Sequence, residues 1–202
     1  MHRFCAILVL LSACATPPGR IVGERVEAGQ EGWSVPPHTC ENGQANTVAN
    51  DDGTISQFCD VYGRTTGRFL RWHPNGQKAT EGKYSDGERH GSWVWWHENS
   101  QLAARGEYIN GQPLGVWSWW HQNGQLETQG DHLSGNRMGE WRTWYPSGQL
   151  KATGQYRNDT KNGAWKVYTQ DGEVGRTEQW DLGRLRSHKA LVKGWELATE
   201  AP

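Results

Sequence analysis

The sequence predicts an all-β fold, an elongated array of stacked antiparallel β-hairpins with a 24-residue period. Three observations predict it. The 202-residue chain is only 35% apolar yet contains 26 Gly and 13 Trp. This composition has too few aliphatic side chains for a thick core and too many aromatic ones for a disordered chain. Glycines recur at a fixed spacing, and aromatic residues and turn signals recur with them. A thin β structure packed by aromatic rings accounts for the low apolar content, for the many glycine and tryptophan residues, and for their fixed spacing.

The charge balance argues against a nucleic-acid partner. The formal net charge is −1, with 21 basic and 22 acidic residues interspersed along the chain. Such a mixture creates no strong field that would concentrate a polyanion.

Residues 1–13 have the parts of a secretory signal peptide. Met1-His2-Arg3 precedes an apolar stretch that is too short to span a bilayer. The following Leu11-Ser12-Ala13-Cys14 resembles a bacterial lipobox, which implies cleavage before Cys14 and lipid attachment to its thiol. The alternative is an ordinary signal peptide that is cut beside Ala13 or Ala15. By resemblance to lipoprotein sorting, Ala15 implies an exported protein anchored to the outer membrane.

Residues 14–37 are predicted to form a flexible tether, and residues 38–66 a cap stapled by a disulfide. The tether carries Pro17-Pro18-Gly19 and shows no sustained period. Cys40 and Cys59 are the pair that remains in an oxidising compartment, so we expect them to form a disulfide. It would close a loop of about 20 residues and stabilise the fold by roughly 3 kcal/mol. A metal or catalytic thiol is the alternative, but it lacks a CxxC motif and a nearby His/Asp arrangement.

The array is predicted over residues 67–183. Its structural glycines are Gly67, Gly91, Gly115, Gly139 and Gly163. The aromatic residue two positions later is Phe69, Trp93, Trp117, Trp141 or Trp165. A second aromatic row contains Trp72, Trp96, Trp120, Trp144 and Tyr168. Turn signals then follow at Asn75-Gly76, Asn99-Ser100, Asn123-Gly124, Ser147-Gly148 and Asp171-Gly172. Each unit closes on a glycine of the row Gly82, Gly106, Gly130 and Gly154. Upstream, Asp52-Gly53 indicates a degenerate first unit.

A two-residue turn at Asn99-Ser100 predicts the register of the hairpin. It places Trp93 opposite Gly106, with the indole ring lying over the glycine, and His97 opposite Leu102.

This register divides the side chains between two faces. The expected core face carries Trp93, Trp95, Leu102, Ala104 and Tyr108, with Leu126 and Leu150 at the equivalent positions. The other face carries the row Trp72, Trp96, Trp120 and Trp144 among charged residues. Five units at about 9.5 Å each give a rod or ribbon roughly 45–50 Å long. Residues 184–202 are predicted to form a C-terminal cap and tail, with Arg184, Leu185, Arg186 and Lys189 blunting the last edge.

The repeat unit resembles the MORN repeat, in the bacterial variant found in antitoxins of the YwqK family and in repeat lipoproteins. The clearest copy is Gly115-Val116-Trp117-Ser118-Trp119-Trp120-His121-Gln122-Asn123-Gly124-Gln125-Leu126, and the resemblance covers about residues 60–183. It implies a non-enzymatic scaffold that binds proteins or lipid headgroups. The chain departs from the pattern at Ser100 and at Asp159, where other units have glycine.

Catalytic and metal sites are not predicted. His73, His97 and His121 form a row with Tyr145, but equivalent positions lie about 9.5 Å apart, and two ligands of one zinc ion lie within about 4 Å. We therefore expect strand-end histidines packed beside aromatic rings. Asp131, His132 and Ser134 are close in sequence, but His132 occupies the tyrosine row of the repeat, whose tyrosine members are Tyr84, Tyr108 and Tyr156. No cofactor is expected.

The row Trp72, Trp96, Trp120 and Trp144 is the predicted binding site. Exposed indoles in register would form an apolar patch suited to a protein partner, and the alternative is a second buried layer. We predict a non-enzymatic, lipid-anchored scaffold that binds an envelope protein. The competing functions are an antitoxin-like binding protein, whose toxin would normally be cytoplasmic, and a glycan-binding module that uses the Trp ladder.

Overall fold

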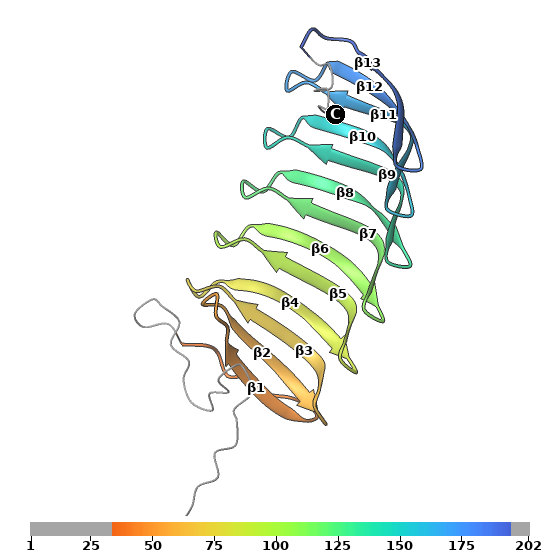
Figure 1. The fold of residues 1–202 in the computed structure, drawn as a ribbon. Coiled ribbons are helices and arrows are strands. Elements are labelled where there is room, and N and C mark those ends of the chain that lie inside the picture. Colours follow the sequence, from red (N-terminus) through yellow and green to blue (C-terminus); the bar gives the residue numbers. More distant parts are fainter. Residues whose placement is uncertain (1–33, 195–202) are drawn as a thin grey trace, which may run out of the picture.

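The protein forms one open antiparallel sheet of 13 strands, and the strands follow one another in chain order. In the computed structural model, which describes residues 34–194, they stack from β1 (orange) to β13 (blue) (Figure 1). The strands are β1 (Gln44–Ala49), β2 (Ile55–Val61), β3 (Arg64–Trp72), β4 (Lys78–Ser85), β5 (Glu88–Trp96), β6 (Leu102–Ile109), β7 (Gln112–Trp120), β8 (Leu126–Leu133), β9 (Asn136–Trp144), β10 (Leu150–Arg157), β11 (Thr160–Tyr168), β12 (Val174–Asp181) and β13 (Arg184–Ala190). The predicted fold class is confirmed. Within residues 34–194, no helix has the length and apolarity needed to cross a bilayer.

Two kinds of turn alternate along the sheet. At one edge the loops have two residues, as at Asp86 (φ 55°) and Gly87 (φ 87°), and both residues adopt the left-handed conformation of a type I′ turn. At the other edge the loops have three residues. The His97 N–H donates to the Gln101 carbonyl at 2.9 Å, and the Ser100 N–H donates to the His97 carbonyl at 2.9 Å. The predicted two-residue turn at Asn99-Ser100 is therefore wrong, because Glu98 also belongs to the loop.

The register predicted for the middle of the hairpin is nevertheless confirmed. Trp93 pairs with Gly106 and Trp95 pairs with Ala104. A bulge between these pairs and the turn leaves Ala103 without a partner and compensates for the longer loop.

The bulge moves a row of leucines to the other face. Beyond it, Trp96 rather than His97 pairs with Leu102. Leu126 likewise pairs with Trp120, and Leu150 pairs with Trp144. The prediction that these leucines belong to the core face is wrong, because cross-strand partners lie on the same face of a sheet.

The ring that covers each glycine comes from the next hairpin. A Cβ atom on Gly106 would lie 2.1 Å from the ring of Trp117, not near Trp93. The same relation joins Gly82 to Trp93, Gly130 to Trp141 and Gly154 to Trp165. The Trp117 Nε1–H also donates to the Glu107 carbonyl of the preceding hairpin at 3.3 Å. The predicted covering within one hairpin is wrong, and the contact instead joins neighbouring units.

The row of structural glycines allows each aromatic ring to reach the glycine of the preceding hairpin. Gly115 has a φ of 67°, a left-handed conformation that strongly favours glycine. It lies where the register between β6 and β7 shifts, opposite Gly106. Gly67, Gly91, Gly139 and Gly163 have φ values between 69° and 70°. Each of these bulges lets the following aromatic ring fold back over the preceding hairpin.

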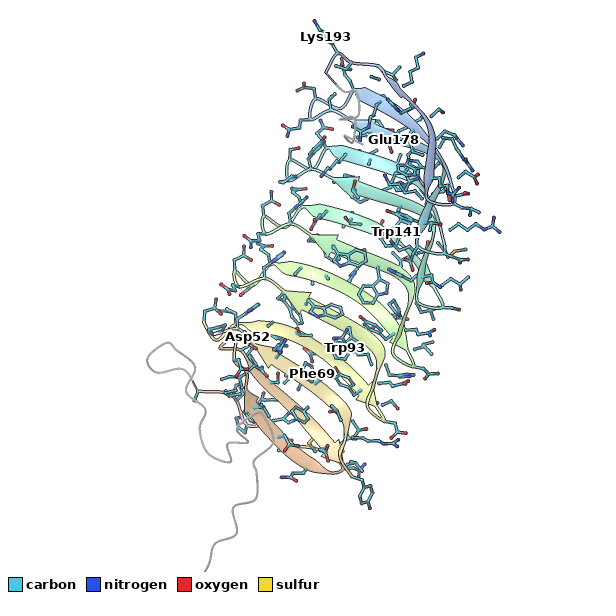
Figure 2. All side chains as sticks on the ribbon, in the orientation of Figure 1. Asp52, Phe69, Trp93, Trp141, Glu178 and Lys193 are labelled. Atoms are coloured by element: carbon cyan, nitrogen blue, oxygen red, sulfur yellow. A yellow bond between two sulfur atoms is a disulfide. The ribbon has the colours of Figure 1, made fainter. Side chains whose placement is uncertain are left out.

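Aromatic rings on one face form a continuous ladder, and we call this side the first face. Ring centroids are 5.8 Å apart for Trp93 and Trp95, 5.6 Å for Trp95 and Trp117, and 5.6 Å for Trp117 and Trp119. Figure 2 shows Phe69, Trp93 and Trp141 following one another along the sheet. The rings adjoining the glycines are the most buried, with Trp93 only 1% exposed. The core of the array is thus a single layer of aromatic rings that pack against the backbone of the glycine row.

The glycine row ends at Glu178, which stands 24 residues after Gly154. Its side chain is buried and accepts hydrogen bonds from Arg176 Nε at 2.7 Å and from Trp180 Nε1 at 2.8 Å, and Lys161 Nζ lies 3.5 Å away. Burial alone would raise the pKa of Glu178, but these donors and positive charges lower it overall. Beyond it, β13 carries exposed charges along the final edge of the sheet.

Ser100→Gly is expected to increase the free energy of unfolding by about 0.5–1 kcal/mol. Ser100 has a φ of 66°, where glycine is unstrained, although its Oγ donates to Gln77 Oε1 at 2.8 Å. Ser100→Ala is the matched control, because it removes the hydrogen bond and keeps the strain, and it should be destabilising. Denaturant unfolding measures both variants. A Ser100→Gly variant less stable than wild type would show that the hydrogen bond outweighs the backbone strain.

The departure at Asp159 has a compensating contact. Asp159 also adopts a positive φ of 63°, but its Oδ1 accepts hydrogen bonds from the Arg137 backbone N–H at 2.9 Å and from Arg137 Nε at 3.1 Å. These hydrogen bonds, the backbone one first, and the positive charge of Arg137 lower the pKa of Asp159. Compared with the glycine of the other units, Asp159 strains the turn but adds an ion pair between adjacent hairpins.

Candidate functional site

An apolar stripe runs along the second face of the sheet, the side opposite the aromatic ladder. It consists of the cross-strand pairs Trp96–Leu102, Trp120–Leu126 and Trp144–Leu150. All six side chains are partly exposed. The predicted row of tryptophans thus lies on one face, and each indole has a leucine beside it.

Cations cover the faces of two of these indoles. Lys78 Nζ lies 5.2 Å from the ring centroid of Trp96, and the Arg105 guanidinium carbon lies 5.6 Å from that of Trp120. Both distances are typical of cation–π contacts. Farther along the sheet, Lys151 Nζ lies 5.6 Å from the ring of Tyr145. The stripe is therefore amphipathic, with apolar edges exposed between positive charges.

The N-terminal segment covers the first member of the tryptophan row. The Trp72 Nε1–H donates to Gln57 Oε1 at 2.8 Å, and Gln57 Nε2 in turn donates to the Pro36 carbonyl at 2.7 Å. Pro36 and His38 line a small cavity with Trp72 and the buried Leu70. Trp72 is therefore part of a packed cap, which distinguishes it from Trp96, Trp120 and Trp144.

A disulfide holds this N-terminal segment to β2. Cys40 and Cys59 are bonded, and their Cα atoms are 5.8 Å apart, as predicted from the sequence. Cys14, the predicted site of lipid attachment, lies outside the described residues.

The histidine row ties each hairpin to the next. His73 Nε2 lies 2.8 Å from the Trp96 carbonyl, His97 Nε2 lies 2.8 Å from the Trp120 carbonyl, and His121 Nε2 lies 3.0 Å from the Trp144 carbonyl. Tyr145 continues the row by donating its hydroxyl proton to the Tyr168 carbonyl at 2.8 Å. Because a carbonyl oxygen can only accept, each histidine Nε2 donates to a carbonyl at the end of a strand in the next hairpin, which explains the row as a structural feature.

Asp131 and His132 do not form a catalytic pair. Asp131 pairs with Val116 and His132 pairs with Gly115, so their side chains lie on opposite faces. The His132 ring instead makes edge contacts with Trp117 and Trp141, at centroid distances of 5.8 Å and 5.2 Å. Its Nδ1 atom is buried without a hydrogen-bond partner. His132 therefore occupies the tyrosine position of the aromatic ladder, as its place in the repeat predicts.

Stability is expected to fall on acidification because of His132. Burial, together with the charge of Arg137, lowers the pKa of His132 below 6.5, although Asp159 and Asp131 act in the opposite direction. The unfolded chain therefore binds this proton more readily. The contribution of neutral His132 is complete above about pH 6.5 and is lost as the pH falls toward the folded-state pKa. The free energy of unfolding, measured by urea denaturation at pH 7.5 and at pH values down to about 5, should show this slope.

His132→Tyr removes the titrating group and keeps an aromatic ring, so its stability should depend less steeply on pH over this range. His90→Tyr, at an exposed histidine, is the matched control and should keep the wild-type slope. An unchanged slope in His132→Tyr would contradict the assignment.

Comparison with known families supports the repeat assignment. Residues 89–110, 113–132 and 139–158 match the family described as MORN repeat variant. These segments correspond closely to the hairpins β5–β6, β7–β8 and β9–β10. MORN repeats are generally involved in protein or membrane binding, and scaffolds of this fold are typically non-catalytic. A comparison with curated proteins found no match.

Sequence reasoning missed two features of the site. The cations over Trp96 and Trp120 were not predicted, although Lys78 and Arg105 each lie on the strand that precedes and pairs with the strand of the indole. The position of His38 beside the disulfide was also not predicted. Its Nε2 lies 3.5 Å from Cys59 Sγ and 3.9 Å from Cys40 Sγ. Only its separation of two residues from Cys40 could have suggested this contact.

Proposed function

We propose that the protein is a non-enzymatic, lipid-anchored scaffold that binds a protein partner at the bacterial cell envelope through the second face of its sheet. The observation that supports this most directly is the apolar stripe. Its indole and leucine side chains remain partly exposed on an open sheet, and within residues 34–194 only the segment near Trp72 covers that face. Exposed tryptophan beside arginine is typical of the centres of protein interfaces.

A protein partner fits the stripe better than a glycan does. A sugar ring binds to an aromatic side chain by lying flat on its face. One ring face of Trp96 is already covered by Lys78, and one ring face of Trp120 by Arg105. Lys78 already pairs with Glu81 at 2.7 Å. A protein surface with apolar side chains and a carboxylate can contact the indole edges and pair with Arg105 at the same time.

Anchoring at the membrane rests on the sequence around Cys14. The proposal places the repeat array in the envelope, where an oxidising environment is compatible with the Cys40–Cys59 disulfide. Intact-mass measurement and membrane fractionation test it with Cys14→Ala as the comparison. A lipid-sized mass increment that disappears in the variant supports anchoring. An unmodified, soluble wild-type protein would contradict it and favour the antitoxin-like alternative.

The binding face is tested by site-specific photocrosslinking in intact cells. A photoreactive side chain in place of Leu126, within the stripe, should crosslink to one envelope protein. The same group in place of Leu133, an exposed residue of the same strand outside the stripe, should not. Trp120→Ala should reduce the Leu126 crosslink about 10-fold or more, as expected for loss of an interface hot spot. Equal crosslinking from both positions would reject the stripe as the specific contact, and crosslinks to polysaccharide alone would reject a protein partner.

A further inference from the structure

His38, Cys40 and Cys59 form a compact group of potential metal ligands beside the first strands of the sheet. Their donor atoms lie within 4.8 Å of one another. The two sulfur atoms are joined as a disulfide, so in this state they cannot ligate a metal as thiolates. The imidazole lies close to both sulfurs, at 3.5 Å from Cys59 Sγ and 3.9 Å from Cys40 Sγ.

We propose that reduction of the Cys40–Cys59 disulfide creates a binding site for Zn²⁺, with the two thiolates and His38 Nε2 as ligands. Bonds of about 2.3 Å to sulfur and 2.0–2.1 Å to nitrogen in a tetrahedral site place nitrogen and sulfur about 3.5 Å apart and the two sulfurs about 3.8 Å apart. The nitrogen–sulfur distances already approach the required value. Only the sulfur atoms have to separate once their bond is broken.

The surroundings meet the other requirements of such a site. An open cavity of about 1240 Å³ is lined by Cys40 and Cys59, which gives an ion access to the sulfur atoms, and His38 lines a second, smaller cavity. The hydrogen bond from Gln57 to the Pro36 carbonyl holds the segment on β2 independently of the disulfide.

The chemistry is a two-electron exchange followed by ligation. A dithiol reductant attacks the Cys40–Cys59 bond, becomes a disulfide itself and leaves two protein thiols. Zn²⁺ then binds the sulfurs, and the two thiol protons are released to solvent. A disulfide oxidant reverses the sequence by thiol–disulfide exchange: it accepts the two electrons, becomes a dithiol, re-forms the Cys40–Cys59 bond and releases the ion. The disulfide and the metal therefore cannot be present at the same time.

Chelator competition with the full chain and Zn²⁺ as the probe tests the proposal. The phosphine-reduced wild type should bind one equivalent, and the oxidised protein should bind at least about 100-fold more weakly. Reduced His38→Ala keeps both thiols and should lose about 10–100-fold in Zn²⁺ affinity. Mutating a residue that only supports a metal ligand already costs a loss of this size. Reduced His90→Ala, at an exposed histidine on β5, is the matched control and should bind like wild type.

Three results would overturn the proposal. Reduced His38→Ala could bind as tightly as wild type, which would leave the imidazole without a role. The oxidised protein could bind as tightly as the reduced one, which would place the ion elsewhere. The strands β1 and β2 could lose amide-exchange protection on reduction without regaining it when Zn²⁺ is added. Retained protection together with thiolate-to-metal absorption of a Co²⁺-substituted sample would support the site.

Discussion

Gly106→Ala is expected to lower the free energy of unfolding by about 3 kcal/mol, an unusually large effect for the addition of one methyl group. The new Cβ atom would lie 2.1 Å from the ring of Trp117, which is only 5% exposed. Neither the glycine backbone nor the packed ring can move far, because Trp117 also contacts Trp95 and Trp119 at centroid distances of 5.6 Å. The ring must leave its position, and much of its burial is lost.

Two further variants make this prediction specific, with urea unfolding as the measurement. Gly87→Asn adds a side chain where no atom lies within 4 Å and where asparagine tolerates the positive φ, so its cost should stay below about 1 kcal/mol. Gly106→Ala in a Trp117→Ala background should cost much less than in wild type, because the clashing ring is absent. Additive effects of the two substitutions would refute the contact between hairpins.

Trp93→Ala is expected to cost about 3–5 kcal/mol, the range for removing a large buried aromatic side chain. Trp93 is 1% exposed, covers Gly82, and makes edge contacts with Tyr84 and Tyr108 at centroid distances of 5.1 Å and 6.1 Å. Because repeat arrays are stabilised by contacts between neighbours, the loss should be greatest in the two hairpins that this ring joins.

Trp96→Ala is the matched control for Trp93→Ala, since it removes the same side chain three residues away on the second face. Its cost should be clearly smaller because the Trp96 side chain remains partly exposed. Denaturant unfolding gives the two free energies, and amide hydrogen exchange locates the loss. Equal losses in the free energy of unfolding would mean that tryptophans on the second face stabilise the fold as much as those on the first.

The repeat period and the two faces were predictable because they depend on properties that a sequence displays directly. Gly91 and Trp93 recur with a constant spacing, and alternation along a strand separates Trp95 from Trp96. The loop length was not predictable in the same way. Asn99-Ser100 suits the last two positions of a three-residue loop as well as a two-residue turn, and the compensating bulge at Ala103 has no sequence signal of its own.

Contacts between hairpins were also beyond the sequence pattern. The glycine and tryptophan rows show that ring and backbone meet, but the period alone does not show whether Trp117 covers Gly130 or Gly106. That choice follows from the bulge at Gly115, which bends the strand toward the preceding hairpin. Likewise, the sequence suggested the Cys40–Cys59 pair, but the position of His38 depends on how the N-terminal segment crosses β2.

Glu178 is buried at the last position of the glycine row, and this limits where a further repeat unit could be inserted. A duplicated unit inserted upstream brings its own glycine and its own indole, so duplication there can be neutral in evolution. At Glu178 a further indole would meet a filled position. The residue 24 positions after Trp165 is Lys189, which pairs with Thr177 on the neighbouring strand. The buried Glu178 therefore closes the glycine row, because the hairpin that contains it offers no bare backbone for another ring.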